Sequence, residues 1–375
     1  MFDFEWDITT IIIFGIIVVF FGLLVAAACM LFEKVKSALS FRKLIGNLYY
    51  NECTYNYKLD KLMKQGASNT YDLEKFASKK FLYGIPVESE EDRFACSAFY
   101  VVTPDSKKIM GRNFDYAPDA SLLTYTKPKK GYTSYAMTSL GFLGIEENGK
   151  IKPDTIPARI ASILSPLCSV DGLNEKGLCV SILELETEPT SQSTGRTPIT
   201  TTSMVRILLD KCATTDEAVE MLKQYDMHSS VGSPYHFLIS DSSGKCVVVE
   251  WPENQLTVIN ATYLTNFQLS EGKDQGVGIG HERYRKLKER LESTGHVLSE
   301  EEAMDLLKNV SIRLGEEGDW QTEWSLVYNI DEFKVTICNE MNYDNPLILG
   351  KELHPQYEIN GKRFNLHKLP GKKKS

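Results

Sequence analysis

The sequence lacks the residue patterns that bind most structural metals or build a disulfide scaffold. Its eight cysteines are spread over 375 residues without a CxxC pair, and its six histidines show no HExxH or paired spacing. It also lacks a basic face, because the formal charge is −8 and a dense basic run occurs only in the terminal GKKKS. We therefore expect no metal, no cofactor and no nucleic-acid partner. Most cysteines are expected to be buried apolar residues in a reducing compartment.

One long segment near the N-terminus carries no charge. Residues 8–32, ITTIIIFGIIVVFFGLLVAAACMLF, exceed the roughly 20 residues with which a helix crosses a bilayer. Acidic residues precede this run and basic ones do not, which disfavours a cleaved signal peptide or a lipoprotein signal ending at Cys29. All-round hydrophobicity over this length disfavours a buried core helix. The sequence thus predicts a single transmembrane anchor at residues 1–32.

Charges beside this run predict its orientation. Lys34, Lys36, Arg42 and Lys43 follow it, and no basic residue precedes it. The positive-inside rule then places the bulk of the protein in the cytoplasm, although the opposite orientation stays open.

The rest of the chain divides into a leader and a larger domain. Residues 33–95 are polar and typical of helices, and they end in the acidic, loop-like stretch PVESEEDR. From residue 96 on, short runs rich in Val, Thr, Tyr and Phe alternate with turn signals, which predicts strands. Paired helices are expected near residues 200–225 and 281–310, with further strands between and after them. This order predicts an α+β domain at residues 96–375, with helix layers outside two antiparallel sheets.

The stretch RFACSAFYVVTPDSKKIMGRNFDY, residues 93–116, predicts a strand, a turn and a second strand. Arg112 and Asp115 are three residues apart, so in a regular strand their side chains would point to opposite faces. A bulge or a strand end could bring both beside Cys96. The alternative is that the two charges lie on a solvated edge, with Cys96 as an ordinary core residue.

Several motifs together resemble the choloylglycine hydrolase family, which includes bile salt hydrolases and penicillin V acylases within the N-terminal-nucleophile hydrolases. The resemblance covers residues 96 to about 338. It rests on Cys96 followed by GRNFDY and then on three further motifs, DGLNEKGL at 171–178, YLTNF at 263–267 and HERYR at 281–285. It implies a four-layer αββα sandwich and an enzyme that hydrolyses linear amide C–N bonds. A homo-oligomer stays open.

The resemblance implies a role for each matching residue. Cys96 would be the nucleophile, with its own α-amine as the base, since an α-amine has a pKa near 8. Arg112 would favour the thiolate, and Asp115 would hold the α-ammonium. Asn266 would help to form the oxyanion hole. Arg283 would be the second active-site arginine, with Arg285 as a competitor for that role.

Two departures from the family pattern stand out. Glu184 occupies the position of a second oxyanion donor, where a carboxylate would repel the developing charge. An α-amine on Cys96 also requires cleavage of the Ala95–Cys96 bond after an unusually long leader. The freed leader could leave with the anchor or stay bound.

Other readings remain open from the sequence. An acyltransferase would use the same residues, and a membrane-anchored binding protein could retain the fold without catalysis. A papain-like Cys–His protease is disfavoured because no histidine has a local context that ties it to Cys96. The expected ligand is a small N-acyl amide, but bile salts, penicillins, N-acyl amino acids, N-acyl homoserine lactones and peptide amides all stay open. Asn174 is expected to be a turn residue.

Overall fold

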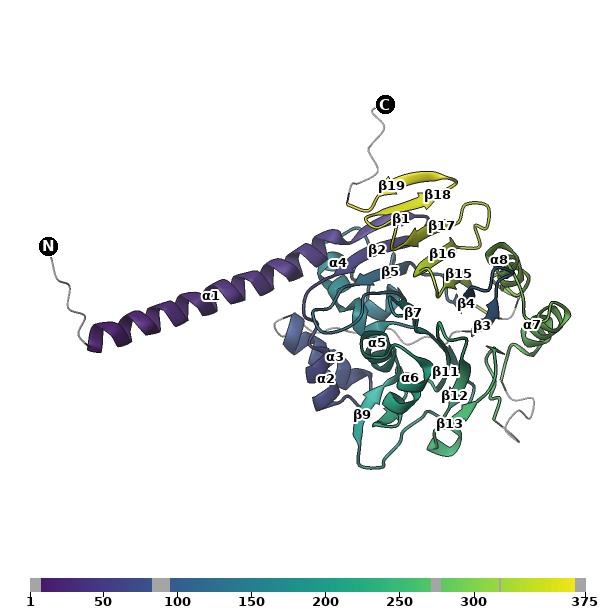
Figure 1. Cartoon of the computed structure of the whole chain (residues 1–375), viewed down its shortest axis with the longest axis horizontal. Helices are drawn as coiled ribbons and strands as arrows, with labels where there is room; N and C mark the ends of the chain where they lie inside the picture. The colour runs from purple at the N-terminus through teal and green to yellow at the C-terminus, as the bar shows by residue number, and fades with distance from the viewer. Residues whose placement is uncertain (1–7, 83–94, 271–277, 317, 368–375) are drawn as a thin grey trace.

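The computed structural model describes residues 8–82, 95–270, 278–316 and 318–367. The acidic loop predicted at PVESEEDR lies outside these residues, and so do the side chains of residues 8–13, 24–27, 29 and 30. Helix α1 (Ile8–Ser40) projects from the body of the molecule (Figure 1). Among the described residues, no helix has both the length and the apolar character needed to cross a membrane, so the predicted transmembrane anchor is not supported.

Sheet A is the larger of two mainly antiparallel sheets. Its neighbouring strands are all antiparallel except β2 and β5, which run parallel. In order across the sheet, its nine strands in the described part of the chain are β1 (Arg42–Ile45), β2 (Leu48–Cys53), β5 (Ser121–Thr126), β6 (Ser134–Ser139), β7 (Asp171–Asn174), β8 (Cys179–Glu184), β11 (Tyr235–Ser240), β12 (Cys246–Glu250) and β13 (Thr257–Ile259).

Sheet B is antiparallel throughout its described strands. In order, these are β14 (Tyr263–Leu264), β3 (Ala95–Val102), β4 (Lys108–Tyr116), β15 (Gln321–Asn329), β16 (Lys334–Asn339), β17 (Leu347–Gly350), β18 (Gln356–Ile359) and β19 (Lys362–Asn365). A separate parallel pair joins β9 (Thr197–Thr200) to β10 (Tyr225–His228).

Helices cover the outer faces of the two sheets, and the sheets contact each other through β3, β8 and β11. On sheet A lie α5 (Thr201–Lys211) and α6 (Thr215–Leu222), and on sheet B lie α7 (His281–Ser293) and α8 (Glu300–Asn309). The order of layers is therefore helix, sheet, sheet, helix, and the predicted mixed α and β fold class is confirmed. The remaining helical segments are α2 (Leu59–Gln65), α3 (Thr70–Phe81), α4 (Ile156–Ala161) and 3₁₀ turns at Gly141–Leu143, Ser162–Cys168 and Pro252–Asn254.

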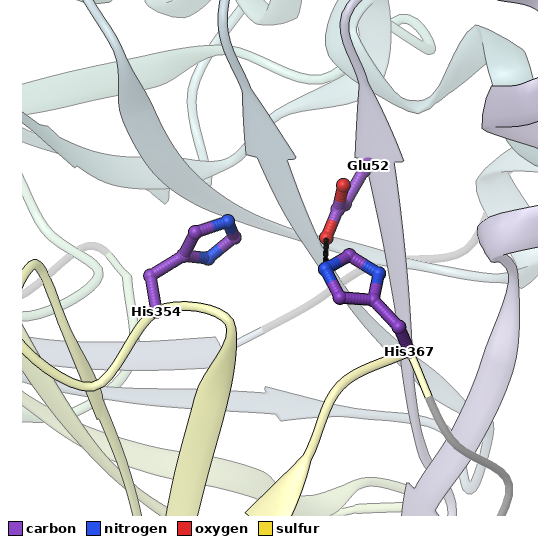
Figure 2. A group of neighbouring side chains, drawn as sticks. All are labelled: Glu52, His354 and His367. Atoms are coloured by element: carbon purple, nitrogen blue, oxygen red, sulfur yellow. Dashed lines mark ion pairs between the residues drawn. The ribbon is translucent and has the colours of Figure 1, made fainter.

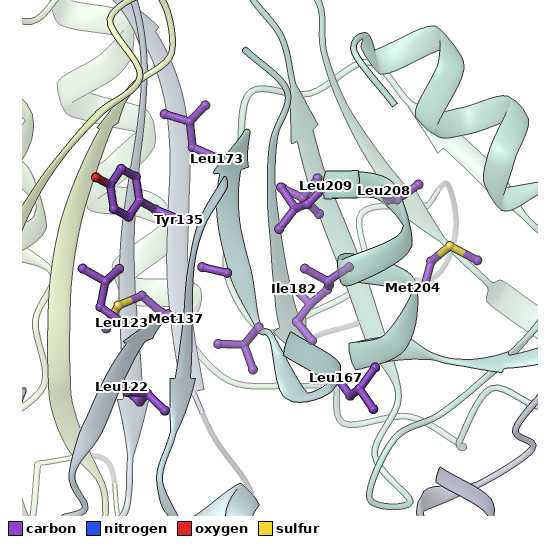
Figure 3. Close-up of a cluster of buried hydrophobic side chains, with 14 of the residues drawn as sticks. Leu122, Leu123, Tyr135, Met137, Leu167, Leu173, Ile182, Met204, Leu208 and Leu209 are labelled. Carbon is purple, nitrogen blue, oxygen red and sulfur yellow. The ribbon is translucent and has the colours of Figure 1, made fainter. Parts of the chain in front are cut away.

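Residue patterns explain the helices on sheet A. In α5, Met204 and Leu208 are four residues apart, so they share one helix face. Figure 3 shows Leu209 on the side of the helix nearer the strands, whereas Met204 and Leu208 lie on the side away from them. Burial of each such side chain contributes about 1.5–3 kcal/mol. Helix α6 begins as its Thr-x-x-Glu pattern predicts, because the Thr214 side chain accepts a hydrogen bond from the backbone of the residue three positions later.

The leader is part of the sheet, not only a set of helices. The helical prediction is wrong over residues 42–53, where β1 and β2 form, whereas α3 lies where a helix was expected. All six residues of β2 are buried, and Tyr49 and Tyr50 point to opposite faces of the strand with almost no exposure. Aromatic residues fit such a doubly covered strand, and tertiary pairing with β5 overrides the local helical preference. The division into domains at residue 95 stays a prediction.

Glu323 makes the stability of the fold depend on pH. It lies where the register of β15 against β4 shifts between Thr322 and Trp324, and it is 2% exposed. Burial raises the pKa of its carboxyl to about 8, although a hydrogen bond from Gln321 acts in the opposite direction. Above its ordinary pKa the unfolded carboxyl loses its proton while the folded one keeps it. Stability should therefore fall as the pH rises from about 4.5 to about 8.

Glu323→Gln is expected to remove this penalty. Near pH 8 the variant should be more stable than the wild type by about 2–4 kcal/mol, and near pH 4 the two should be equal. Denaturant unfolding at both pH values measures the difference. The exposed Glu352→Gln is the charge-matched control and should shift neither midpoint. Equal stabilisation by Glu323→Gln at both pH values would contradict the titration argument.

Candidate active site

The β3–β4 hairpin holds Cys96 beside Arg112. Cys96 pairs with Phe114 and Ala98 pairs with Arg112, and directly opposite residues in an antiparallel pair share one face. Cys96 and Arg112 therefore both face sheet A. The Arg112 Nη2 donates to the Cys96 Sγ at 3.2 Å, and both side chains are fully buried.

Asp171 holds the other side of the Arg112 guanidinium. Its Oδ2 lies 2.9 Å from the Arg112 Nε, and its Oδ1 accepts a hydrogen bond from the Tyr328 hydroxyl at 2.6 Å. Arg112 also donates to the Ile182 carbonyl at 2.6 Å and to the Ser181 hydroxyl. Burial raises the pKa of Asp171, while Arg112 opposes that shift. The sequence motif DGLN contains Asp171, but nothing in it indicated a pairing with Arg112.

Asp115 lies on the opposite face of β4 from Arg112, because β4 pairs with β3 without a bulge. The register instead shifts on the neighbouring strand β15. Asp115 is still close to Cys96, since it pairs with Ala95, the residue before it. Its Oδ1 accepts a hydrogen bond from the Thr322 hydroxyl at 2.5 Å, and its Oδ2 lies 3.7 Å from the Arg283 Nη1.

Asn266 and Arg283 hold the main chain of Cys96. The Cys96 N–H donates to the Asn266 Oδ1 at 2.7 Å, and the Arg283 Nη1 donates to the Cys96 carbonyl. Arg283 also donates to the Ser97 hydroxyl at 2.8 Å and to the Asn266 Oδ1 at 3.1 Å. The structure thus brings together all five residues singled out in the sequence. Arg285, the competing arginine, is exposed and pairs with two glutamates of its own helix.

Burial governs the protonation of the Cys96 thiol. Removal from water raises its pKa to about 12, whereas Arg112, the backbone N–H of Asp115 and Arg283 act to lower it. In this uncleaved arrangement the sulfur is a thiol at neutral pH. The remaining described cysteines are free, and all but the half-buried Cys168 are buried, as predicted.

The described histidines near this region bind other partners. His236 is buried between the Glu250 carboxylate at 3.0 Å and the Thr265 carbonyl at 2.7 Å. His281 stacks on the ring of Phe267. Within the described residues, the Cys96 sulfur is therefore paired with an arginine and not with an imidazole, unlike the arrangement of a Cys–His protease.

Glu184 and Tyr235 border the site on sheet A. They are directly paired across β8 and β11, and the Glu184 carbonyl accepts a hydrogen bond from the Asn266 Nδ2 at 2.9 Å. Burial first, and then the Glu184 carboxylate, raise the pKa of Tyr235. Tyr235 was not identified from the sequence, since only tertiary pairing places it here. Asn174 is the last residue of β7 and not part of the turn itself, but its Oδ1 accepts the N–H groups of Lys176 and Leu178 in the turn that follows.

A pocket of about 300 Å³ begins where β8 ends. Apolar side chains form part of its wall, among them Leu185, Tyr235 and Trp251. Glu188 and Glu253 also line it and give it a polar side. A ligand with an apolar body and a polar end fits this lining.

Comparison with known proteins identifies the sequence around this site. Residues 96–267 match the family model described as linear amide C–N hydrolases, choloylglycine hydrolase family. A penicillin V acylase from Pectobacterium atrosepticum is 25% identical over 183 residues, which cover 44% of this chain and 46% of that protein. The chain thus matches less than half the length of this curated relative.

Two solved structures show a partial likeness to this chain. A mutant of the conjugated bile acid hydrolase from Clostridium perfringens is 16% identical, with a TM-score of 0.48 over 68% of this chain and 92% of that one. A penicillin V acylase from Agrobacterium tumefaciens is 14% identical, with a TM-score of 0.43 over 65% and 83% of the two chains. Residues 96–267 are therefore similar to the choloylglycine hydrolase family of linear amide C–N hydrolases.

Proposed function

We propose that the protein is an N-terminal-nucleophile amidohydrolase that cleaves a linear amide through an acyl intermediate on Cys96. The observation that carries the proposal is the set of contacts on Cys96 itself. Arg112 contacts its sulfur, Asn266 its nitrogen and Arg283 its carbonyl oxygen. A structural cysteine needs only apolar neighbours, whereas a terminal nucleophile needs its sulfur and its amine held in fixed positions.

Activation begins with hydrolysis of the Ala95–Cys96 bond. This step consumes one water and gives a carboxylate on Ala95 and an α-amine on Cys96. Asp115, whose backbone is paired with Ala95, lies beside the new amine and can hold it as an ammonium. An unprotonated α-amine can then accept the thiol proton near neutral pH.

Catalysis then proceeds in two steps. The Cys96 sulfur attacks the substrate carbonyl, and the amine leaves with a proton from the α-ammonium. Water, activated by the same α-amine, hydrolyses the thioester and releases the acid. The Asn266 Oδ1 accepts a hydrogen bond from the Cys96 N–H, so the Asn266 amide lies beside the nucleophile. Its Nδ2 can serve the oxyanion if it exchanges its bond to the Glu184 carbonyl.

The pocket beyond Glu184 is the proposed site for the substrate. Its apolar wall suits the acyl part of an N-acyl compound, and its polar side suits the amide and leaving group. The curated relative is named a penicillin V acylase, and that name supports an N-acyl amide as the class of substrate.

Intact-mass and N-terminal analysis of the purified full chain tests the proposal. We expect a fragment that begins at Cys96 and hydrolysis of N-acyl amide substrates by that preparation. Amide hydrolysis by a chain that stays uncleaved at this bond would overturn the N-terminal-nucleophile mechanism.

Gly280→Ala tests the placement of Arg283. Gly280 precedes α7 with φ +84°, and a Cβ there would lie 2.7 Å from the Arg283 Nη2. The variant should therefore displace the guanidinium from the Cys96 carbonyl and lower kcat by about 10²-fold. The backbone strain should cost a further 1–2 kcal/mol of stability, approximately. Amide hydrolysis and thermal unfolding measure the two effects.

Gly295→Ala is the matched control, because Gly295 also has a positive φ but a Cβ there meets no atom within 4 Å. It should lose stability by a similar amount and keep its kcat. Equal kcat in the two variants would show that the position of Arg283 is not critical.

A further inference from the structure

Three side chains from distant parts of the sequence meet away from the Cys96 site. Glu52 comes from β2, His354 from the segment between β17 and β18, and His367 follows β19. One ligand atom from each lies within 4.8 Å of those from the other two. Figure 2 shows both imidazole rings turned toward the Glu52 carboxylate.

The ligand atoms of His354 and His367 do not hydrogen-bond to Glu52, so they could bind a metal ion. The Glu52 Oε1 lies 3.7 Å from the His367 Nε2, which is longer than a hydrogen bond. The Nδ1 of His354 is buried and makes no hydrogen bond within the described residues, although its ring stacks on Tyr125 at 4.4 Å. A buried nitrogen without a partner is costly unless it binds something.

The spacing and chemistry fit a transition-metal ion. Two ligand atoms each 2.0–2.2 Å from a tetrahedral zinc lie about 3.4 Å apart, so small side-chain movements would close this cluster around an ion. Imidazole ligands with one carboxylate suit zinc and similar divalent metals better than magnesium or calcium. The Tyr50 hydroxyl donates to the Glu52 Oε1 at 3.1 Å, and such an outer contact commonly orients a ligating carboxylate.

We propose that Glu52, His354 and His367 form a binding site for a divalent transition-metal ion of the zinc type. Three protein ligands leave a fourth position for water. The site joins β2 of the leader to the C-terminal hairpin β18–β19 through the approach of His367 to Glu52. Because it contains no residue of the Cys96 site, it does not depend on the proposed reaction.

A competing interpretation is a simple ion pair between Glu52 and His367, whose side chain is 47% exposed. That pair would leave the buried His354 nitrogen without a role, and it would gain little at such exposure. The two interpretations differ in what happens when metal is added.

Zinc titration of the tag-free full chain tests the site. Calorimetry should show one saturable ion per chain, and cobalt in place of zinc should give a visible absorption band typical of low coordination number. His354→Ala, His367→Ala and Glu52→Gln should each weaken binding by at least about tenfold. The same titrations in a Cys96→Ala background exclude binding by that thiol.

His296→Ala is the matched control, since His296 contacts Thr262 and Tyr263 instead. It should bind zinc as the wild type does. Thermal unfolding without metal verifies that each variant is folded. Added zinc should raise the unfolding temperature of the wild type but not that of the three ligand variants. Equal zinc affinity in those variants, or no saturable binding below millimolar zinc, would overturn the proposal.

Discussion

Cys96→Ala is expected to abolish amide hydrolysis, with a loss of at least about 10³-fold, because removal of a covalent nucleophile leaves only binding and oxyanion stabilisation. The same variant should stay uncleaved between residues 95 and 96 if, as we propose, the chain cuts this bond with the Cys96 sulfur. Hydrolysis is measured with an N-acyl amide that releases a detectable amine, and cleavage is measured by intact mass.

Cys338→Ala is the control for the loss of a buried thiol. Cys338 is fully buried among apolar side chains near α8 and lies outside the Cys96 network. Its variant should process and hydrolyse normally, at some cost in stability. If Cys96→Ala retained both activities, or if both cysteine variants lost them equally, the assignment of the nucleophile would be wrong.

A chain that begins at Cys96 should not fold by itself. It lacks β1 and β2, so the edge of β5 would lose six paired residues and the core would lose Leu48, Tyr49 and Tyr50. It would also lose the Asn51 side chain, which donates to the Ser162 carbonyl at 2.7 Å. Burial of each large apolar side chain contributes about 1.5–3 kcal/mol, and a whole domain has only about 5–15 kcal/mol of net stability.

Size-exclusion chromatography and circular dichroism measure this effect. The shortened chain should be aggregated or unfolded, whereas a chain that begins at Glu33 keeps both strands and should fold. In the wild type, the pieces before and after the cleaved bond should elute together and separate only in denaturant. A folded, monodisperse chain beginning at Cys96 would show that the leader strands are dispensable.

Local patterns in the sequence predicted the part of the fold that depends on nearby residues. The β3–β4 hairpin has β-branched and aromatic residues on both sides of a TPDSK turn, and both strands lie where they were expected. The leader strands were missed because their pairing partner, β5, is some seventy residues away. The short strands β17, β18 and β19 pair with neighbours in the sequence, and they were missed because this C-terminal segment has weak periodicity.

The five residues of the candidate site were found because they lie in motifs that resemble those of a known family. Their roles stay predictions, but the structure decides one point that the sequence left open, since Arg283 faces Cys96 and Arg285 faces solvent. Asp171 and Tyr235 were missed because only the packing of one sheet on the other brings them to the site. The sequence predicted no metal site, because the spacing of His354 and His367 along the chain does not show that both approach Glu52 in the fold.

The parallel pairing of β2 with β5 has a kinetic consequence once the chain is cut. Before cleavage, β2 is tethered to its partner, so forming the sheet is a unimolecular step that does not depend on protein concentration. After cleavage, the same pairing joins two polypeptides, and their reassembly after unfolding becomes bimolecular. The cut protein would then stay folded mainly because it unfolds slowly, and it would refold poorly once unfolded. Since β2 lies before the cut and β5 after it, the chain should fold before it is cleaved.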